Sequence, residues 1–257
     1  MKSPDIDTPT LIAPPEWGVI DFLSDLHLAP ATPQTLAALE QHLERTSAQA
    51  VFLLGDIFEV WIGDDTRFEG FEAECTALLQ GASQRRRLFF MAGNRDFLLG
   101  EAMAQDAGLQ LLPDPVALEA FGQRILLSHG DALCLDDHDY QRFRAQVRGA
   151  DWQREFLAQP LAQRRAIARQ MREASELNKR QQSPQTWSDL DANACRDWLR
   201  QTRCQVLLHG HTHRPAVHDL GDGLWRWVLS DWDLEAELPR ADVLRLDAQG
   251  LRRIALL

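Results

Sequence analysis

The order of hydrophobic and polar positions along the chain predicts short strands that alternate with helices. Apolar runs of strand length occur at 19–23, 50–54 and 88–91, and helical spacing separates them at 35–45 and 71–83. This rhythm is typical of βαβ units. Further strand-length runs predict hairpin-like pairs, at 116–120, 124–127, 205–208, 225–229, 243–246 and 251–255. We therefore expect a mixed sheet flanked by helices, in the α/β (α+β) class.

Between residues 131 and 204 the pattern changes, because two helical stretches follow one another without a strand between them. The stretches are 141–157 and 161–178, and Pro160 separates them. We expect an inserted helical cap over about residues 138–200. The segment Asp139–Arg180 holds 10 Lys+Arg and 5 Asp+Glu, a balance of +5. Its basic face is either a solvated surface or a surface that meets an anionic ligand or lipid headgroups.

Charge and composition narrow the possible classes. The 257 residues carry a net charge of −11, which argues against general binding to nucleic acid. The four cysteines form no C-x-x-C pair and no disulfide framework, so a reducing cytosol is expected. Residues 1–17 contain four prolines and predict a loose extension before a domain at 18–257. Neither a signal peptide nor a membrane-spanning apolar segment is expected.

Polar clusters follow the ends of five predicted strands. One aspartate after a strand is usually a turn residue, and one histidine is usually structural. Five clusters at converging strand ends instead indicate one crevice. Oxygen and imidazole groups without thiolates suit Mn²⁺, Fe²⁺, Zn²⁺ or Co²⁺, and a pair of such ions can activate water against phosphorus. The clusters are Ser24-Asp25-Leu26-His27, Gly55-Asp56, Gly93-Asn94-Arg95-Asp96, His129-Gly130-Asp131 and His209-Gly210-His211-Thr212-His213.

A resemblance to the calcineurin-like metallophosphoesterases extends over nearly all of the folded chain. It is carried by the ordered set Asp25-x-His27, Gly55-Asp56, Gly93-Asn94, His129 and Gly210-His211-x-His213. The longer strings 24–28, 55–65, 93–100 and 209–215 are similar to one subfamily of lipid A synthesis. That similarity implies hydrolysis of the diphosphate of UDP-2,3-diacylglucosamine to UMP and 2,3-diacylglucosamine 1-phosphate.

The resemblance also implies a β-sandwich flanked by helices, with an inserted cap and two bound cations. One cation would be held by Asp25, His27, Asp56 and His213, and the other by Asp56, Asn94, His129 and His211. Asp56 would then bridge the two ions. We expect Mn²⁺, although this donor set accepts several first-row ions.

The catalytic residues that the resemblance implies are Asp56, Asn94, Arg95 and His129. Many relatives have a histidine where this chain has Arg95. A guanidinium cannot serve as the acid for a leaving oxygen, but it can hold phosphate oxygens in a fork.

Substrate contacts are implied for Asn94, Arg95 and His211 and for four residues at or within the cap, Asp137, Ser175, Lys179 and Gln182. Asp137 has an alternative interpretation as a helix N-cap. Asp64 and Asp65 are interpreted as turn residues. Apolar cap positions either line an acyl groove or simply bury the inner face of the helices, namely Trp152, Phe156, Leu157, Leu161, Ile167 and Met171.

The leading hypothesis is therefore a hydrolase attached peripherally to the cytoplasmic face of the inner membrane. Its expected partners are a lipid-linked UDP-sugar and an anionic membrane surface, with no nucleic acid and no obligate protein partner. One alternative is a nucleotide pyrophosphatase or phosphodiesterase that acts on a soluble substrate. The other is a non-catalytic, metal-binding scaffold.

Overall fold

Two mixed β-sheets pack face to face in the computed structural model, which describes residues 6, 8–181 and 189–257, with side chains omitted for 174–181. In strand order, the first sheet contains β1 (Thr10–Ile12), β6 (Val116–Ala120), β7 (Gln123–Leu127), β8 (Val206–His209), β10 (Leu224–Val228) and β9 (Val217–Gly221). The second contains β12 (Gly250–Ala255), β11 (Asp242–Asp247), β2 (Val19–Leu23), β3 (Ala50–Leu54), β4 (Arg87–Met91) and β5 (Leu109–Leu112).

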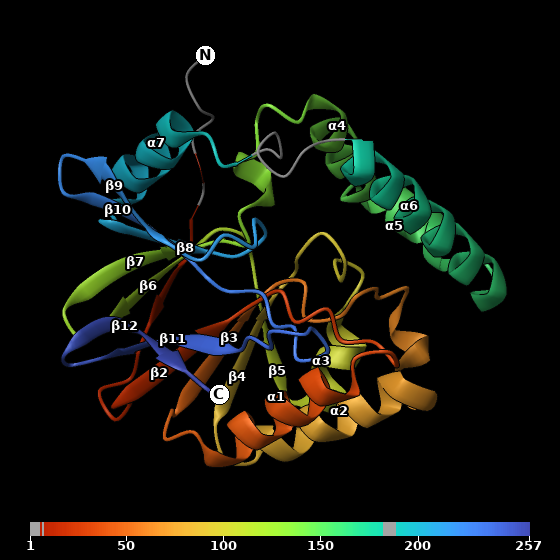
Figure 1. The fold of residues 1–257 in the computed structure, drawn as a ribbon, viewed down its shortest axis with the longest axis horizontal. Helices are drawn as coiled ribbons and strands as arrows, with labels where there is room; N and C mark the ends of the chain where they lie inside the picture. Colours follow the sequence, from red (N-terminus) through yellow and green to blue (C-terminus); the bar gives the residue numbers. More distant parts are fainter. Residues whose placement is uncertain (1–5, 7, 182–188) are drawn as a thin grey trace.

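Helices cover the outer faces of the sandwich. The second sheet is covered by α1 (Pro33–Arg45), α2 (Gly70–Ser83) and α3 (Glu101–Ala107), and the first by α7 (Ala192–Thr202). Figure 1 shows a separate group of helices standing to one side of the sandwich, α4 (His138–Val147), α5 (Ala150–Leu157) and α6 (Leu161–Gln181). Two short 3₁₀ turns complete the elements, η1 (Asp64–Phe68) and η2 (Asp131–Leu133).

Alternation along the strands explains why the sheets are covered on both faces. On β2, Ile20 and Phe22 point into the space between the sheets, whereas Leu23 packs toward the outer helices. Phe52 of β3 stacks on Phe89 of β4 in the inter-sheet core, with ring centroids 4.5 Å apart. Because both faces are apolar, these strands lie in the interior, and their carboxyl ends form one fixed edge.

The mixed α/β architecture with flanking helices is confirmed, and three details differ from the expectation. Residues 10–12, expected in a loose extension, form β1 and pair with β6 in parallel register. The expected helix 141–157 is divided, because Gly149 has extended backbone angles and begins α5 as its N-cap. The helix α7 lies within the range expected for the cap but packs against β8 and β10.

The sequence pattern also did not predict β5, β9 and α7. Strand β9 alternates exposed and half-buried residues at a sheet edge, so it lacks the continuous apolar run that marks the central strands. Among the described residues, no helix is both long enough and apolar enough to cross a membrane.

Candidate metal centre

All seven predicted ligand residues lie where strands end at one edge of the sandwich. Asp25 and His27 follow β2, Asp56 follows β3, and Asn94 follows β4. The other sheet supplies His129 after β7, and His211 and His213 after β8. The parallel pairings β2–β3–β4 and β7–β8 direct these loops to the same side.

The backbone is left-handed at most of these positions. Asp25, His27, Asp56, His211 and His213 have φ values of 56°, 49°, 54°, 67° and 53°. They are five of the eight described non-glycine residues with positive φ. Asp, Asn and His tolerate this region better than most residues, yet it still costs of order 1 kcal/mol or more per residue. Backbone strain is therefore concentrated at the predicted ligands.

The first group of ligand atoms comes from Asp25, His27 and His213. The Nε2 atoms of His27 and His213 are 3.2 Å apart, and Nε2 of His213 is 3.4 Å from Oδ1 of Asp25. One ligand atom from each residue can be chosen so that all lie within 4.8 Å of one another. This spacing fits a single cation held by one carboxylate oxygen and two imidazole nitrogens.

The second group surrounds the amide oxygen of Asn94. This Oδ1 atom is 3.1 Å from Nε2 of His129 and 2.8 Å from Nδ1 of His211. Nε2 of His129 is 3.7 Å from Oδ1 of Asp56. Carboxylate oxygens of Asp25 and Asp56 and a His129 nitrogen also lie within 4.8 Å of one another, so Asp56 lies beside both groups. The structure thus brings all seven residues together, with Asp56 at the position predicted for a bridge.

Two motif glycines are explained by close packing against the carboxylates. A β-carbon on Gly93 would lie 2.2 Å from Oδ1 of Asp56, and one on Gly210 would lie 2.3 Å from Oδ2 of Asp25. Any larger residue would displace the carboxylate or the loop. The glycines in these sequence strings therefore leave space for the predicted ligands.

Nearby carboxylates favour positive charge at His129 and His213, whereas burial and the charge of His129 lower the pKa of His211 to about 4. Burial lowers the pKa of His129, but the charges of Asp56 and Asp25 outweigh burial and raise that pKa to about 9. Burial also opposes protonation of His213, whereas contacts with Asp231 and Asp25 raise its pKa to about 10. A buried site with this charge and these oxygen and nitrogen donors fits divalent cations.

Asp96 holds the β3 and β4 loops together. Its buried carboxylate accepts hydrogen bonds from the backbone N–H groups of Gly93 and Ile57, both at 2.8 Å, and of Asp56 and Phe58, both at 3.3 Å. Burial and the neighbouring charge of Asp56 raise its pKa to about 6. The sequence analysis missed this role, although Asp96 directly follows Asn94-Arg95.

Arg95 lies at the rim of the crevice. Its backbone N–H donates to Oδ1 of Asp56 at 2.8 Å, and its guanidinium Nη1 is 3.5 Å from Oε1 of Glu59. The side chain is mostly buried, and it places a fixed positive charge beside the ligand group. This position fits the predicted grip on phosphate oxygens.

The predicted cap contacts have different outcomes. Asp137 is exposed and accepts a hydrogen bond of 3.0 Å from the backbone N–H of Tyr140, so it is the N-cap of α4, and its predicted contact with the substrate stays a prediction. Ser175 and Lys179 lie on α6, but their side chains are outside the described part of the chain. Gln182 lies outside the described residues altogether.

Most of the apolar cap positions pack against the main core. Phe156 belongs to the core cluster beneath the cap, and Trp152, Leu161 and Ile167 pack against that cluster. The rings of Trp152 and Phe156 stack with centroids 4.9 Å apart. These contacts favour the burial interpretation, whereas Leu157 remains exposed.

Asp64 and Asp65 have structural contacts, as their interpretation as turn residues predicts. Asp64 accepts hydrogen bonds from Trp61 Nε1 and from the backbone N–H groups of Gly100 and Met103, so it fixes the start of α3. Asp65 forms a two-pronged ion pair with Arg164 of the cap.

Three residues beside the ligands were not among the sequence predictions. Oε2 of Glu59 is 3.0 Å from Nδ1 of His27, and Oδ2 of Asp231 is 3.4 Å from Nδ1 of His213. The Tyr140 ring lies over His211 with centroids 5.9 Å apart. Glu59 falls inside the 55–65 string, but nothing in its spacing separates it from its neighbours. Asp231 follows a predicted strand, as the ligands do, whereas Glu59 and Tyr140 are identified only by the folded geometry.

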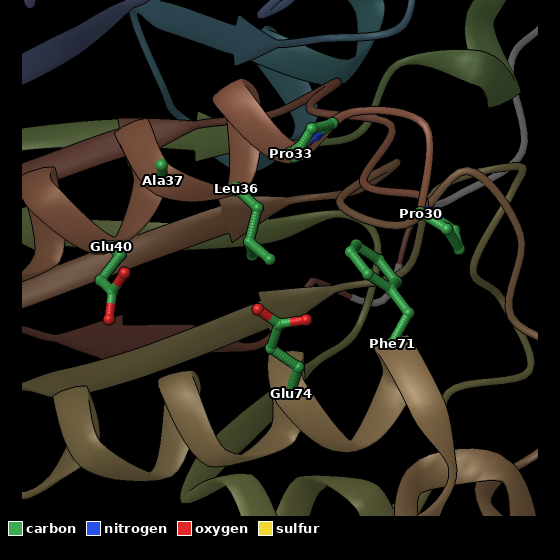
Figure 2. A pocket seen from close by; sticks show the side chains of 7 residues that line it. All are labelled: Pro30, Pro33, Leu36, Ala37, Glu40, Phe71 and Glu74. Atoms are coloured by element: carbon green, nitrogen blue, oxygen red, sulfur yellow. The ribbon is translucent and has the colours of Figure 1, made fainter.

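A groove of about 330 Å³ between α1 and α2 has the wrong chemistry for an anionic substrate (Figure 2). Two carboxylates, Glu40 and Glu74, border it, and the described residues of its lining include no Lys, Arg or His. No predicted ligand lines it. The candidate active site is therefore the crevice at the strand ends.

Comparison with known proteins shows the family of this chain. The sequence model of the calcineurin-like phosphoesterase family matches residues 18–215, and the chain belongs to this family. Among its relatives is the UDP-2,3-diacylglucosamine hydrolase of Chromobacterium violaceum, 47% identical over 92% of this chain and 98% of that protein. A protein of the same name from Xanthomonas axonopodis is 45% identical over 91% of this chain and 98% of its own length. A third, from Stenotrophomonas maltophilia, is 41% identical over 89% and 95%.

Proposed function

We propose that this chain hydrolyses the diphosphate bond of UDP-2,3-diacylglucosamine, releasing UMP and 2,3-diacylglucosamine 1-phosphate for lipid A synthesis. The observation that carries the proposal is the convergence of the seven donor residues and Arg95 at one edge of the sandwich. The substrate follows from the names of relatives that are 45–47% identical over about nine-tenths of the chain.

The chain's own residues account for binding and orientation. Asp25, His27 and His213 would hold one divalent cation and Asn94, His129 and His211 the other, with Asp56 between them; we propose Mn²⁺ for both. Bound cations would supply charge neutralisation at the phosphoryl oxygens and activation of a water molecule.

Arg95 would orient the diphosphate. Its guanidinium carries charge at every working pH and presents a planar fork to phosphate oxygens. The scissile phosphorus would then lie between this fork and the ligand group. Because either UMP or the sugar phosphate, whichever is the leaving group, departs readily as an anion, electrostatic stabilisation is the main requirement.

The helices α4–α6 would act as the cap over the lipid part of the substrate. Phe156, Trp152 and Ile167 support the cap from the core side, so the acyl chains would contact the remaining apolar surface, beginning at Leu157. We propose that Ser175, Lys179 and Gln182 contact the sugar.

Peripheral attachment to the cytoplasmic face of the inner membrane is part of the proposal. Most of the cap arginines that could meet a membrane, however, are already paired with carboxylates. Arg164, one of the basic residues counted in the segment 139–180, has only 3% of its surface exposed and is paired with Asp65. Arg165 is paired with Glu69, and Arg172 with Glu59. Of the described arginines in 139–173, Arg169 alone is exposed without an ion pair. It is the best candidate for a headgroup contact.

The test is to incubate Mn²⁺-loaded protein with UDP-2,3-diacylglucosamine and with UDP-glucosamine and to measure UMP release from each. Selective release from the acylated substrate supports the proposal. Equal release from both would favour a pyrophosphatase acting on soluble nucleotides. Cation binding with no release from either would favour a scaffold.

A further inference from the structure

Glu59 lies behind the ligand group and contacts three basic side chains. It follows β3 in the loop that also carries Asp56, and its side chain is 13% exposed. One oxygen, Oε2, is 3.0 Å from Nδ1 of His27. The other, Oε1, is 2.8 Å from Nη1 of Arg172 and 3.5 Å from Nη1 of Arg95.

The contact with His27 bears on which ring nitrogen is available to a cation. A carboxylate at Nδ1 favours a proton on that nitrogen, so Nε2 keeps its lone pair. Nε2 is the atom that faces His213, at 3.2 Å. The ring N–H of His27 is not well aligned with Oε2, so the hydrogen bond is not formed. Because the two atoms are 3.0 Å apart, a small rotation of the ring would complete it.

The contact with Arg172 joins the same carboxylate to the cap. Arg172 lies on α6, and Arg165, two turns before it, forms another ion pair with the core through Glu69 at 3.4 Å. Glu69 and Arg165 are both largely exposed, and Glu69 follows η1 rather than a ligand loop. Both ion pairs therefore attach α6 to the core. Of the two carboxylates, only Glu59 also contacts a predicted ligand, His27.

We propose that Glu59 is a positioning residue that couples the cap to the metal centre, by orienting His27 through Oε2 while it holds Arg172 and Arg95 through Oε1. Two guanidinium groups share this oxygen, so the carboxylate does not neutralise both. The surplus positive charge stays at the crevice rim, where an anionic diphosphate is expected. This inference uses the proposed function only in requiring that the crevice holds cations.

The first experiment titrates the apoprotein with Mn²⁺ in a calorimeter, without substrate. Glu59→Gln keeps the size of the side chain but removes its charge, and we expect the affinity for one cation to fall about 10–100-fold. The matched control is Glu69→Gln, which removes the neighbouring ion pair and is expected to bind Mn²⁺ like the wild type. If Glu59→Gln binds both cations with wild-type affinity, the proposal is overturned.

A second pair of measurements isolates the cap. Arg172→Met should leave Mn²⁺ affinity within about twofold of wild type, because Glu59 still faces His27. It should, however, speed amide hydrogen exchange in the peptide 161–173, and Glu59→Gln should do the same. Unchanged exchange in both variants would refute the coupling.

Two further results keep the test decisive. If Glu59→Gln does not fold, Glu59→Asp retains the charge while withdrawing the carboxylate by one methylene, and the same loss of Mn²⁺ affinity is expected. Loss of affinity without any UMP release by the wild-type protein would refute the proposed substrate but not this role. If the wild type releases UMP but Glu59→Gln does not change the cation affinity, the role of Glu59 is refuted and the proposed substrate is not.

Discussion

Arg164 of the cap and Asp65 of the core form a two-pronged ion pair in which the arginine is buried and the aspartate is exposed. The guanidinium also donates to the backbone oxygens of Ile62 and Gln159. One cap residue thus satisfies acceptors on both sides of the junction between cap and core.

Arg164→Met should therefore loosen the cap. Hydrogen bonds to charged groups contribute about 1.5–3 kcal/mol each, and the oxygen of Ile62 would lose its partner. We expect faster hydrogen exchange in α5 and α6 with little change in β2–β4. Asp65→Asn is the milder comparison, because the backbone contacts of Arg164 remain. Equal protection of α6 in wild type and Arg164→Met would contradict the anchoring role.

Arg169→Glu should weaken binding to vesicles that contain anionic lipid. Arg169 is exposed and unpaired among the described cap arginines, and a charge near an anionic surface contributes about 1 kcal/mol. The effect should decrease as salt rises, because screening acts over about 8–10 Å near physiological ionic strength. Co-sedimentation with vesicles at several salt concentrations measures it, and Arg142→Glu provides a control at a paired arginine. Salt-independent binding would exclude the electrostatic contact.

Asp56→Ala and His211→Ala should each abolish hydrolysis while the protein remains folded. Each change removes a donor from a crevice that is proposed to hold two cations. We expect UMP release to fall at least a hundredfold, since even outer partners of a ligand affect affinity 10–100-fold. Metal content measured after dialysis should fall in parallel. Full turnover in either variant would refute the two-cation assignment.

Arg95→Ala should reduce turnover with no change in metal content. One charge-assisted contact in a water-poor site is expected to contribute about 10²–10³ in rate, or about 3–4 kcal/mol. Arg95→Lys should recover only part of this loss, because an ammonium lacks the planar fork. The measurements are UMP release and bound Mn²⁺ for each variant. Loss of bound metal from Arg95→Ala would show a different role.

Asp21 should make the fold sensitive to acid. Burial opposes ionisation of this carboxylate, but contacts with Arg245, His42 and Thr46 outweigh burial and lower its pKa from 3.8 to about 2. Because the folded pKa is the lower one, the ionised group stabilises the fold above about pH 4 and loses this effect as pH falls toward 2. The contribution is about 2 kcal/mol.

The measurement is urea unfolding of wild type and Asp21→Asn between pH 2.5 and 7. Asp21→Asn should be less stable at pH 7, and the difference should shrink at the acid end. A stability difference that does not vary with pH would contradict the assignment to ionised Asp21.

The strand-end clusters were the part of the site that the sequence could predict. Asp25, Asp56 and His129 each follow an apolar strand, and parallel strands bring their carboxyl ends to one edge. Asp231 follows β10, which pairs in parallel with β8 and ends at the same edge, but a lone aspartate after a strand is usually a turn residue, and its contact with His213 is seen only in the fold. Supporting contacts of this kind depend on tertiary geometry, which spacing along the chain does not record.

The cap shows the opposite limit. Helical spacing predicts the helices around Pro160, but the charge count over the segment did not distinguish paired from free arginines. Arg164 illustrates the difference, because its partner Asp65 lies 99 positions away in the chain. An excess of positive charge in a sequence segment therefore indicates a basic surface only when the ion pairs of the folded protein are known.

The left-handed backbone at Asp25, His27, Asp56, His211 and His213 constrains how this chain can change over evolution. Glycine adopts that conformation freely, so replacement of a donor by glycine would relieve strain as well as remove chemistry. Descendants released from selection for hydrolysis would then gain stability as they lose the site, and reversal would require the strain to be restored. The free energy of folding thus favours changes that inactivate this crevice and opposes changes that assemble it.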